Sequence, residues 1–211
     1  MKYIIVFLFL AISNVVWSQN LKLATDDQKK EIISQMTHAS AIANTLECRF
    51  IQKKTISVLS ETVTSEGLMY YKKEDKLRWQ YNKPYSYLFI LNRGKVLIKN
   101  ENRTDKFDTN SNKLFKEISE IMLGSVRGNL LIGNKKFSSQ YFVGTSVNVI
   151  KLTPHNKDLK QLMQAINLTI SKTDWLVKSI EMQEKGGDNT VITFTEKNVN
   201  KTISDDLFYI N

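Results

Sequence analysis

The strongest constraint on the fold is an alternation of apolar and polar residues that begins at Leu46 and recurs along the chain. In the stretch KLRWQYNKP (residues 76–84), Leu77, Trp79 and Tyr81 are separated by single polar residues. A period of two indicates a β-strand with one apolar face. Similar segments occur at 46–54, 62–73, 83–92, 94–100, 146–154, 163–171, 175–184 and 189–196, and 101–109 is expected to contain one more short strand.

Polar turns between these segments predict an antiparallel meander. The sequence Lys-Gly-Gly-Asp at 185–188 predicts a hairpin turn between the last two strands. Gly67, inside the segment 62–73, predicts a bulge or a bend.

Two segments follow a helical period instead. Residues 25–43 begin with Thr25 and Gln28 at the spacing of a capping box, and their apolar stripe consists of Ile32, Met36, Ala39 and Ala43. Residues 111–123 form a second helix that Gly124 is expected to end, and its apolar residues are Leu114, Ile118, Ile121 and Met122. A helical turn is expected at 129–133. These patterns predict the α+β class, with one large antiparallel sheet whose concave apolar face is covered by the helices at 25–43 and 111–133.

The first residues predict export. A lysine, an apolar run from Tyr3 to Ile12 and a small residue at Ser18 are typical of a cleaved signal peptide. The apolar run is shorter than the roughly 20 residues that a membrane-spanning helix needs. We therefore expect a signal peptide at residues 1–18 and a single mature domain at 19–211, without repeats or linkers.

The charge of the chain argues against nucleic acid as a partner. The sequence has 30 basic and 21 acidic residues, and removal of Lys2 with the signal peptide leaves 29 against 21, a formal charge of +8. The basic residues are scattered as pairs, whereas a nucleic-acid binder concentrates them in a stripe. Weak attraction to acidic proteins or anionic membrane surfaces is one use for this excess. An ordinary solvated surface is the other interpretation.

No motif for catalysis or metal binding is present. Cys48 is the single cysteine, so no intrachain disulfide forms, and its apolar strand favours a small buried hydrophobe over a reactive thiol. His38 and His155 lie far apart, without the spacing of a zinc site. Glu117 and Glu120 could be paired carboxylates, but more often such residues form the exposed face of an amphipathic helix. The pattern therefore favours a binding module over an enzyme.

Several pieces of the chain resemble the LolA family of periplasmic carriers of outer-membrane lipoproteins. They are FIQK at 50–53, SEGLMYYKKEDKLRWQYNKP at 65–84, KLTP at 151–154 and the closing GGDNTVITFTEKNVNKTISDDLFYI at 186–210. Their order and spacing behind a signal peptide carry the resemblance, which runs from the N-terminal helix almost to the end of the chain.

The resemblance implies an incomplete antiparallel β-barrel, lidded by helices, whose apolar hollow accepts the acyl chains of lipoproteins. It implies a periplasmic monomer without a cofactor. Its partners would be acylated lipoproteins, an inner-membrane lipoprotein-releasing transporter and an outer-membrane acceptor, with transient contact to a membrane surface.

Carried over by position, the resemblance also implies site residues. Lys73 falls where better-studied members have an arginine that hydrogen-bonds the lid backbone, and Arg78 or Arg49 could take over that role because lysine lacks the planar fork of donors. The expected lid residues are Phe115, Ile118 and Met122. The expected cavity residues are Phe50, Met69, Leu77, Trp79, Tyr81 and Phe89.

Other interpretations stay open at this point. The same apolar residues could fill a dry core, since lipid pockets and cores share their lining. The half-barrel could carry another acylated lipid, or it could bind a protein partner as an envelope sensor or adaptor. An exported enzyme is the weakest alternative.

Overall fold

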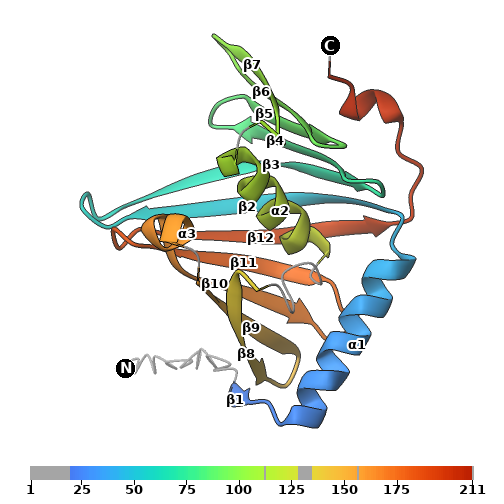
Figure 1. The fold of residues 1–211 in the computed structure, drawn as a ribbon, viewed down its shortest axis with the longest axis vertical. Helices are drawn as coiled ribbons and strands as arrows, with labels where there is room; N and C mark the ends of the chain where they lie inside the picture. Colours follow the sequence, from blue (N-terminus) through green and yellow to red (C-terminus); the bar gives the residue numbers. More distant parts are fainter. Residues whose placement is uncertain (1–19, 112, 128–134, 156, 211) are drawn as a thin grey trace, which may run out of the picture.

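The computed structural model describes residues 20–111, 113–127, 135–155 and 157–210. Within these residues, twelve strands form one antiparallel sheet in the order β1-β8-β9-β10-β11-β12-β2-β3-β4-β5-β6-β7 (Figure 1). The strands are β1 (Lys22–Leu23), β2 (Thr45–Ile56), β3 (Glu61–Lys72), β4 (Lys76–Lys83), β5 (Tyr87–Asn92), β6 (Lys95–Asn100), β7 (Thr104–Asp108), β8 (Phe137–Val143), β9 (Val147–Pro154), β10 (Met163–Ser171), β11 (Val177–Glu184) and β12 (Asn189–Val199).

The sheet consists of two meanders joined at its centre. Strands β2–β7 form one and strands β8–β12 the other, and β2 pairs with β12 between them, with Phe50 opposite Phe194. The outermost strands, β1 and β7, do not pair with each other, so the curved sheet is not closed. This architecture confirms the predicted α+β class and the incomplete antiparallel barrel.

The helices lie over one face of this sheet. They are α1 (Asp26–Ile42), α2 (Lys113–Arg127) and the short α3 (Lys157–Leu162). In Figure 1, α2 crosses in front of the middle of the sheet and α1 runs along one side. Apolar residues of all three helices pack in one core with the inward-facing residues of the strands, among them Ile32, Met36, Leu123, Val126 and Leu159.

Local signals in the sequence explain several of these elements. The Thr25 side chain accepts from the backbone of Gln28, whose own side chain accepts from Thr25, which confirms the capping box. Gly67 lies opposite Phe50 in the β2–β3 pairing, and the β3–β4 register shifts at this glycine, as the predicted bulge requires. The turn at 185–188 joins β11 to β12, with Gly187 at a φ of 90°.

The prediction for the second helix was wrong at its end, since α2 continues past Gly124 to Arg127. Gly124 is buried, and a helix accepts glycine where close packing offsets its low propensity. The predicted turn at 129–133 and the predicted signal peptide at 1–18 lie outside the described residues. Strands β1 and β8, helix α3 and a C-terminal 3-10 helix, η1 (Asp205–Phe208), were not expected.

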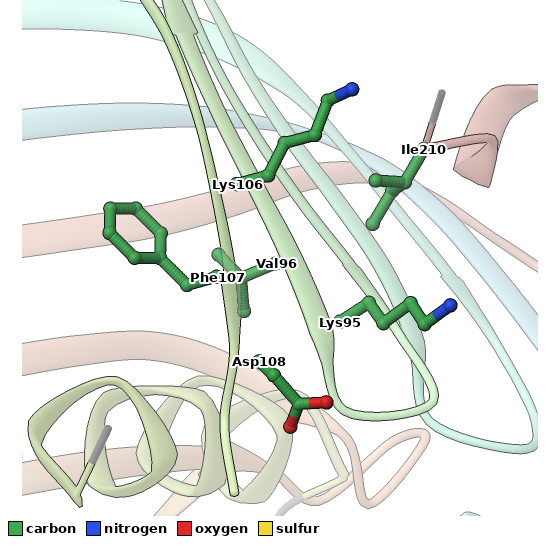
Figure 2. Close-up of a pocket in the computed structure, with 6 residues that line it drawn as sticks. All are labelled: Lys95, Val96, Lys106, Phe107, Asp108 and Ile210. Atoms are coloured by element: carbon green, nitrogen blue, oxygen red, sulfur yellow. The ribbon is translucent and has the colours of Figure 1, made fainter. Parts of the chain in front are cut away.

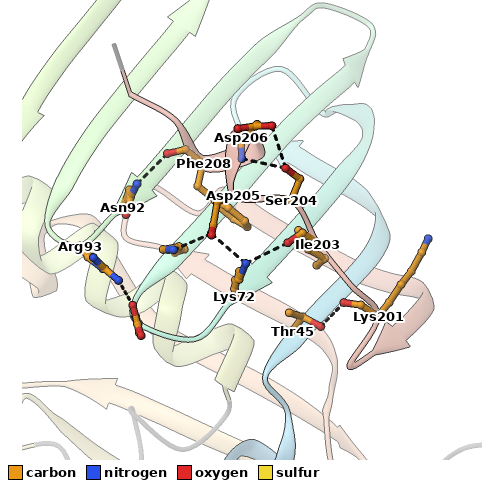
Figure 3. Close-up of polar contacts among 12 residues, drawn as sticks. Thr45, Lys72, Asn92, Arg93, Lys201, Ile203, Ser204, Asp205, Asp206 and Phe208 are labelled. Carbon is orange, nitrogen blue, oxygen red and sulfur yellow. Dashed lines mark hydrogen bonds and ion pairs between the residues drawn. The ribbon is translucent and has the colours of Figure 1, made fainter.

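The C-terminal segment (residues 200–210), which contains η1, packs on the other face of the sheet. Ile203 and Phe208 join Ile90 and Leu97 in a second apolar cluster. Figure 3 shows the polar contacts that hold this segment. The Asp205 carboxylate lies 3.0 Å from Lys72 Nζ and 2.7 Å from Lys76 Nζ, and Asn92 Nδ2 donates to the carbonyl of Phe208 at 3.1 Å.

Candidate functional site

An apolar cavity of about 360 Å³ lies between α2 and the face of the sheet that it covers. None of its lining residues carries a charged side chain. They are Gln52, Trp79, Tyr81, Tyr87, Phe89, Ile98, Ile121, Met122, Met163, Ile180, Met182 and Ile192. A hollow of this composition suits hydrocarbon, with a few polar atoms to orient it.

The cavity occupies one end of the barrel. Gln52 lies in the second half of β2, Tyr87 and Met163 begin β5 and β10, and Ile192 is the fourth residue of β12. These positions lie in the halves of their strands that lead to or lie beside the turns at 57–60, 84–86 and 185–188, and we call this end of the sheet the turn end. Two of these turns contact each other, because Ser57 Oγ donates to the carbonyl of Gly186 at 3.1 Å.

The opposite half of the barrel is a filled core. Cys48, Met69 and Leu77 face the same side of the sheet as Trp79, and each is at most 1% exposed. Ile32 and Met36 of α1 belong to the same core. The barrel is therefore hollow at the turn end and solid at the other end, where α1 leads into β2.

The structure divides the predicted cavity residues between these two halves. Trp79, Tyr81 and Phe89 line the cavity. Phe50, Met69 and Leu77 face the same way but are buried in the core, and the cavity lining does not include them. Sequence parity identified the inward face correctly, whereas the boundary between hollow and filled halves depends on where the helices pack.

A continuous set of ring contacts supports one wall of the cavity. The Phe50 ring lies 4.7 Å from Trp79 and 5.0 Å from Tyr81, and Tyr81 lies 5.9 Å from Tyr87, measured between centroids. The Tyr81 hydroxyl donates to Gln52 Oε1 at 2.8 Å. Burial raises the pKa of Tyr81 to about 12, so this hydroxyl stays neutral at ordinary pH. Phe50 therefore supports the aromatic wall through these ring contacts, although it does not line the cavity itself.

Of the predicted lid residues, Met122 lines the cavity from α2, together with its neighbour Ile121. The side chains of Phe115 and Ile118 lie outside the part of α2 whose side chains the structure describes. Their role at a lid stays a prediction.

Lys73 contacts the end of α1. Its Nζ donates to the carbonyl of Ala41 at 2.6 Å, and its backbone N–H donates to the carbonyl of Asn44 at 2.8 Å. A cation at the C-terminus of a helix is favourable because the last carbonyls carry partial negative charge. Its predicted role in holding a closed lid stays untested.

Arg78 and Arg49 lie elsewhere. Arg78 donates to Gln80 and to the carbonyl of Leu207, so it fastens the C-terminal segment on the outer face of the sheet. Arg49 pairs with Glu196 at 2.7 Å on the surface.

Arg127, which the sequence analysis did not single out, ties the end of α2 to the sheet. Its Nε donates to the Tyr71 hydroxyl at 2.8 Å and its Nη2 to Asp75 at 2.6 Å, and its guanidinium lies 5.1 Å from the centroid of the Tyr71 ring. Burial raises the pKa of Tyr71, against the opposing effect of Arg127. Together with the Glu120–Lys136 ion pair, these contacts attach α2 to its surroundings in the described residues. The sequence feature that could have identified Arg127 is a basic residue in the last turn of the helix.

The cavity lining does not include Cys48 or Glu120. Cys48 is 1% exposed, and burial raises the pKa of its thiol to about 12, as expected for a small buried hydrophobe. Glu120 pairs with Lys136 at 2.6 Å. Within the described residues, no group of three His, Cys, Asp or Glu side chains is arranged to hold a metal ion.

A second hollow of similar volume lies at the edge strand β7 (Figure 2). Figure 2 shows Phe107 pointing to one side of the strand, and Lys106 and Ile210 lying on the other. Its residues alternate between charged and apolar ones. They lie on both faces of the sheet edge, so they do not form one continuous lining. The cavity under α2 is the better candidate site.

No helix in the described part of the chain combines the length and hydropathy needed to cross a membrane.

Several solved structures are similar to this chain at low sequence identity. A LolA superfamily protein from Nitrosomonas europaea aligns at 10% identity with a TM-score of 0.44, over 86% of this chain and 97% of that one. An uncharacterised conserved protein from Thermus thermophilus aligns at 9% identity with a TM-score of 0.51, over 87% of this chain and 94% of that one. The lipoprotein LppX of Mycobacterium tuberculosis aligns at 11% identity with a TM-score of 0.45, over 85% of this chain and all of that one.

No curated protein sequence matches the chain. The model of the family described as outer membrane lipoprotein carrier protein LolA matches residues 41–211, which include every strand from β2 to β12. The chain belongs to the LolA family.

Proposed function

We propose that this protein is a periplasmic carrier that holds the acyl chains of lipoproteins in the cavity and moves them from the inner to the outer membrane. The observation that supports it most directly is an uncharged apolar cavity inside an incomplete barrel, in a member of the LolA family. Its partners would be a lipoprotein-releasing transporter at the inner membrane and an acceptor at the outer membrane.

The lining fits this task energetically. Each methylene group removed from water contributes about 0.8 kcal/mol, so ten of them contribute about 8 kcal/mol. A carrier needs affinity of this order and must still release its cargo. The cavity has a volume of about 360 Å³, near the lower limit of typical ligand pockets. A cargo with several acyl chains therefore requires α2 to move away from the sheet.

The turn end is where cargo would enter and leave. Val58 is 88% exposed, Leu59 60%, Tyr85 57% and Leu162 47%, and all four lie in or beside the turns that surround the cavity. Exposed apolar side chains are candidates for contact with a membrane or another protein. Transient contact with a membrane surface or with the two transport partners is therefore proposed at this end.

The experiment that tests the function is mass spectrometry of the molecules that co-purify with the protein from the periplasm of its own host. Trp79→Glu places a carboxylate in the cavity, and Tyr209→Glu makes the same change at an exposed residue outside it. We expect acylated lipoproteins on the wild type and on Tyr209→Glu, and none on a folded Trp79→Glu protein.

The other outcomes separate the alternatives. Free lipids or glycolipids in place of lipoproteins would support a carrier function with a different cargo. A well-folded wild type with nothing bound under gentle extraction would favour a sensor or adaptor that binds a protein partner.

A further inference from the structure

The sulfur atoms of this protein are divided between the two halves of the barrel. Of its six methionines, Met1 belongs to the predicted signal peptide. Met36 and Met69 are buried in the filled half, at 1% and 0% exposure. The other three, Met122, Met163 and Met182, are half-buried and line the cavity.

The three cavity methionines come from three different elements. Met122 is on α2, Met163 begins β10 and Met182 is on β11, whereas the aromatic wall belongs to β4 and β5. Thioether side chains are flexible and polarisable, and they fill irregular apolar space well. They are also the side chains that oxidants convert from apolar to polar, since a sulfoxide carries a strongly accepting oxygen.

The single thiol does not compete for an oxidant. Cys48 is 1% exposed, and its thiol is protonated because burial raises its pKa to about 12. Oxidation of a cysteine follows thiolate character and access, and Cys48 has neither. The accessible sulfur of the described chain is therefore concentrated in the cavity.

We propose that Met122, Met163 and Met182 form an oxidation site that switches cargo binding off. The reaction is oxygen transfer from a hypohalous acid, with hypochlorous acid as the simplest case. The thioether sulfur loses two electrons and gains the oxygen atom to form the sulfoxide, the chlorine gains those electrons and leaves as chloride, and the proton passes to water. Methionine sulfoxide reductases reverse the change. The inference rests on the proposed carrier function.

The cavity offers few hydrogen-bond donors to a sulfoxide oxygen. Its lining carries no charged donor, and among the described lining residues the buried donor without a partner is the Trp79 indole N–H, which can serve one of the three sulfoxides. An acyl chain in the cavity would exclude water and leave the remaining sulfoxide oxygens without a donor, and burying a polar group without a hydrogen bond is unfavourable. We expect oxidation of these residues to weaken acyl binding about tenfold or more, on that basis.

The test uses purified mature protein and a dansyl-labelled undecanoic acid as the probe. Limited hypochlorous acid treatment should add one oxygen at Met122, Met163 and Met182 before Met36 and Met69, as followed by peptide mass spectrometry. Probe affinity should fall in step, and repair with reductases for both sulfoxide epimers should restore it. This repair needs no variant, so the test does not depend on the folding of a mutant.

Matched variants assign the effect. The M122L/M163L/M182L protein, compared with its own untreated sample, should show no further loss of affinity after oxidant, because leucine has no sulfur to oxidise. The M36L/M69L protein should lose affinity as the wild type does. Unchanged affinity with sulfoxide formed at the cavity methionines would overturn the inference, as would first oxidation at Met36 or Met69. Failure of the untreated protein to bind the probe would instead count against the carrier function.

Discussion

Gly67 shows how one residue sets the shape of the sheet near the cavity. A Cβ atom at this position would lie 2.1 Å from the carbonyl oxygen of Gln80 and 2.5 Å from Phe50 Cζ. The Phe50 ring can pack behind Trp79 and Tyr81 because β3 has no side chain here. The aromatic wall of the cavity therefore depends on a glycine that is not part of its lining.

We expect Gly67→Ala to lower the free energy of unfolding by about 1–3 kcal/mol, the usual cost of overpacking. The measurement is urea denaturation followed by far-UV circular dichroism. Gly186→Ala is the matched control, since no atom lies within 4 Å of the added Cβ, and it should change stability by less than about 0.5 kcal/mol. Equal effects of the two substitutions would refute the steric argument.

Tyr81 gives the cavity a dependence on alkaline pH. Its pKa is raised from 10.0 to about 12 by burial, so the unfolded chain loses this proton before the folded protein does. The stability that this residue contributes is fully present below pH 10 and is lost as the pH rises towards 12. We expect the free energy of unfolding to fall over this window, and to fall less steeply in Tyr81→Phe. The two slopes come from denaturant titrations at several pH values, and identical slopes would contradict the assignment.

At the scale of elements, the two longer helices are attached differently. Lys73, on the turn between β3 and β4, reaches the last turn of α1. Helix α2 instead carries its own cation, Arg127, which contacts Tyr71 and Asp75. Under the proposed function, movement of α2 away from the sheet would break the Arg127 contacts and the Glu120–Lys136 ion pair.

We expect Arg127→Met to loosen α2 without unfolding the sheet. Hydrogen–deuterium exchange should become faster at amides of residues 113–127 and stay unchanged in β2 and β12. Lys30→Met is the control, because the Lys30–Asp27 pair is highly exposed and pairs of this kind contribute little. Faster exchange across the whole sheet would indicate a general loss of stability and count against a local attachment.

The elements that the sequence predicted well are those with a strong local signal. The capping box fixes the start of α1, and the two glycines at 186–187 fix the turn before β12. Strand β8 was not predicted because Ser139 occupies an inward position between Phe137 and Tyr141 and interrupts the apolar alternation. Arg127 was not singled out because the predicted helix stopped at Gly124, and the packing that keeps this glycine helical is tertiary.

The site was predictable only in part for the same reason. Period two places Leu77, Trp79 and Tyr81 on one face, and all three do face the interior. Leu77 nevertheless belongs to the filled core and Trp79 to the cavity. That difference comes from helices distant in sequence, which alternation along one strand does not encode.

At the scale of the whole molecule, the C-terminal segment closes a second apolar cluster on the outer face. Phe208 is fully buried there, against Ile90 and Leu97. Lysines from β3 and β4 hold the segment through Asp205. Burial of Phe208 and the ion pairs of Asp205 with these lysines explain why the C-terminal segment is part of the folded unit.

We expect Phe208→Ala to lower the free energy of unfolding by about 3–5 kcal/mol, as for other large-to-small changes in a core. Calorimetry should show a clear fall in the melting temperature. Tyr209→Ala, at a residue that is 67% exposed, should have an effect of less than about 0.5 kcal/mol. A small effect of Phe208→Ala would mean that the C-terminal segment is dispensable for folding.

The division of the barrel into a filled and a hollow half has a consequence for repeated use. The core at the α1 end is complete in itself, so the fold does not depend on a guest to supply missing packing. Occupation of the hollow half then adds to stability without being required for it. A carrier of the kind proposed would therefore remain folded after it has released its cargo and could bind again.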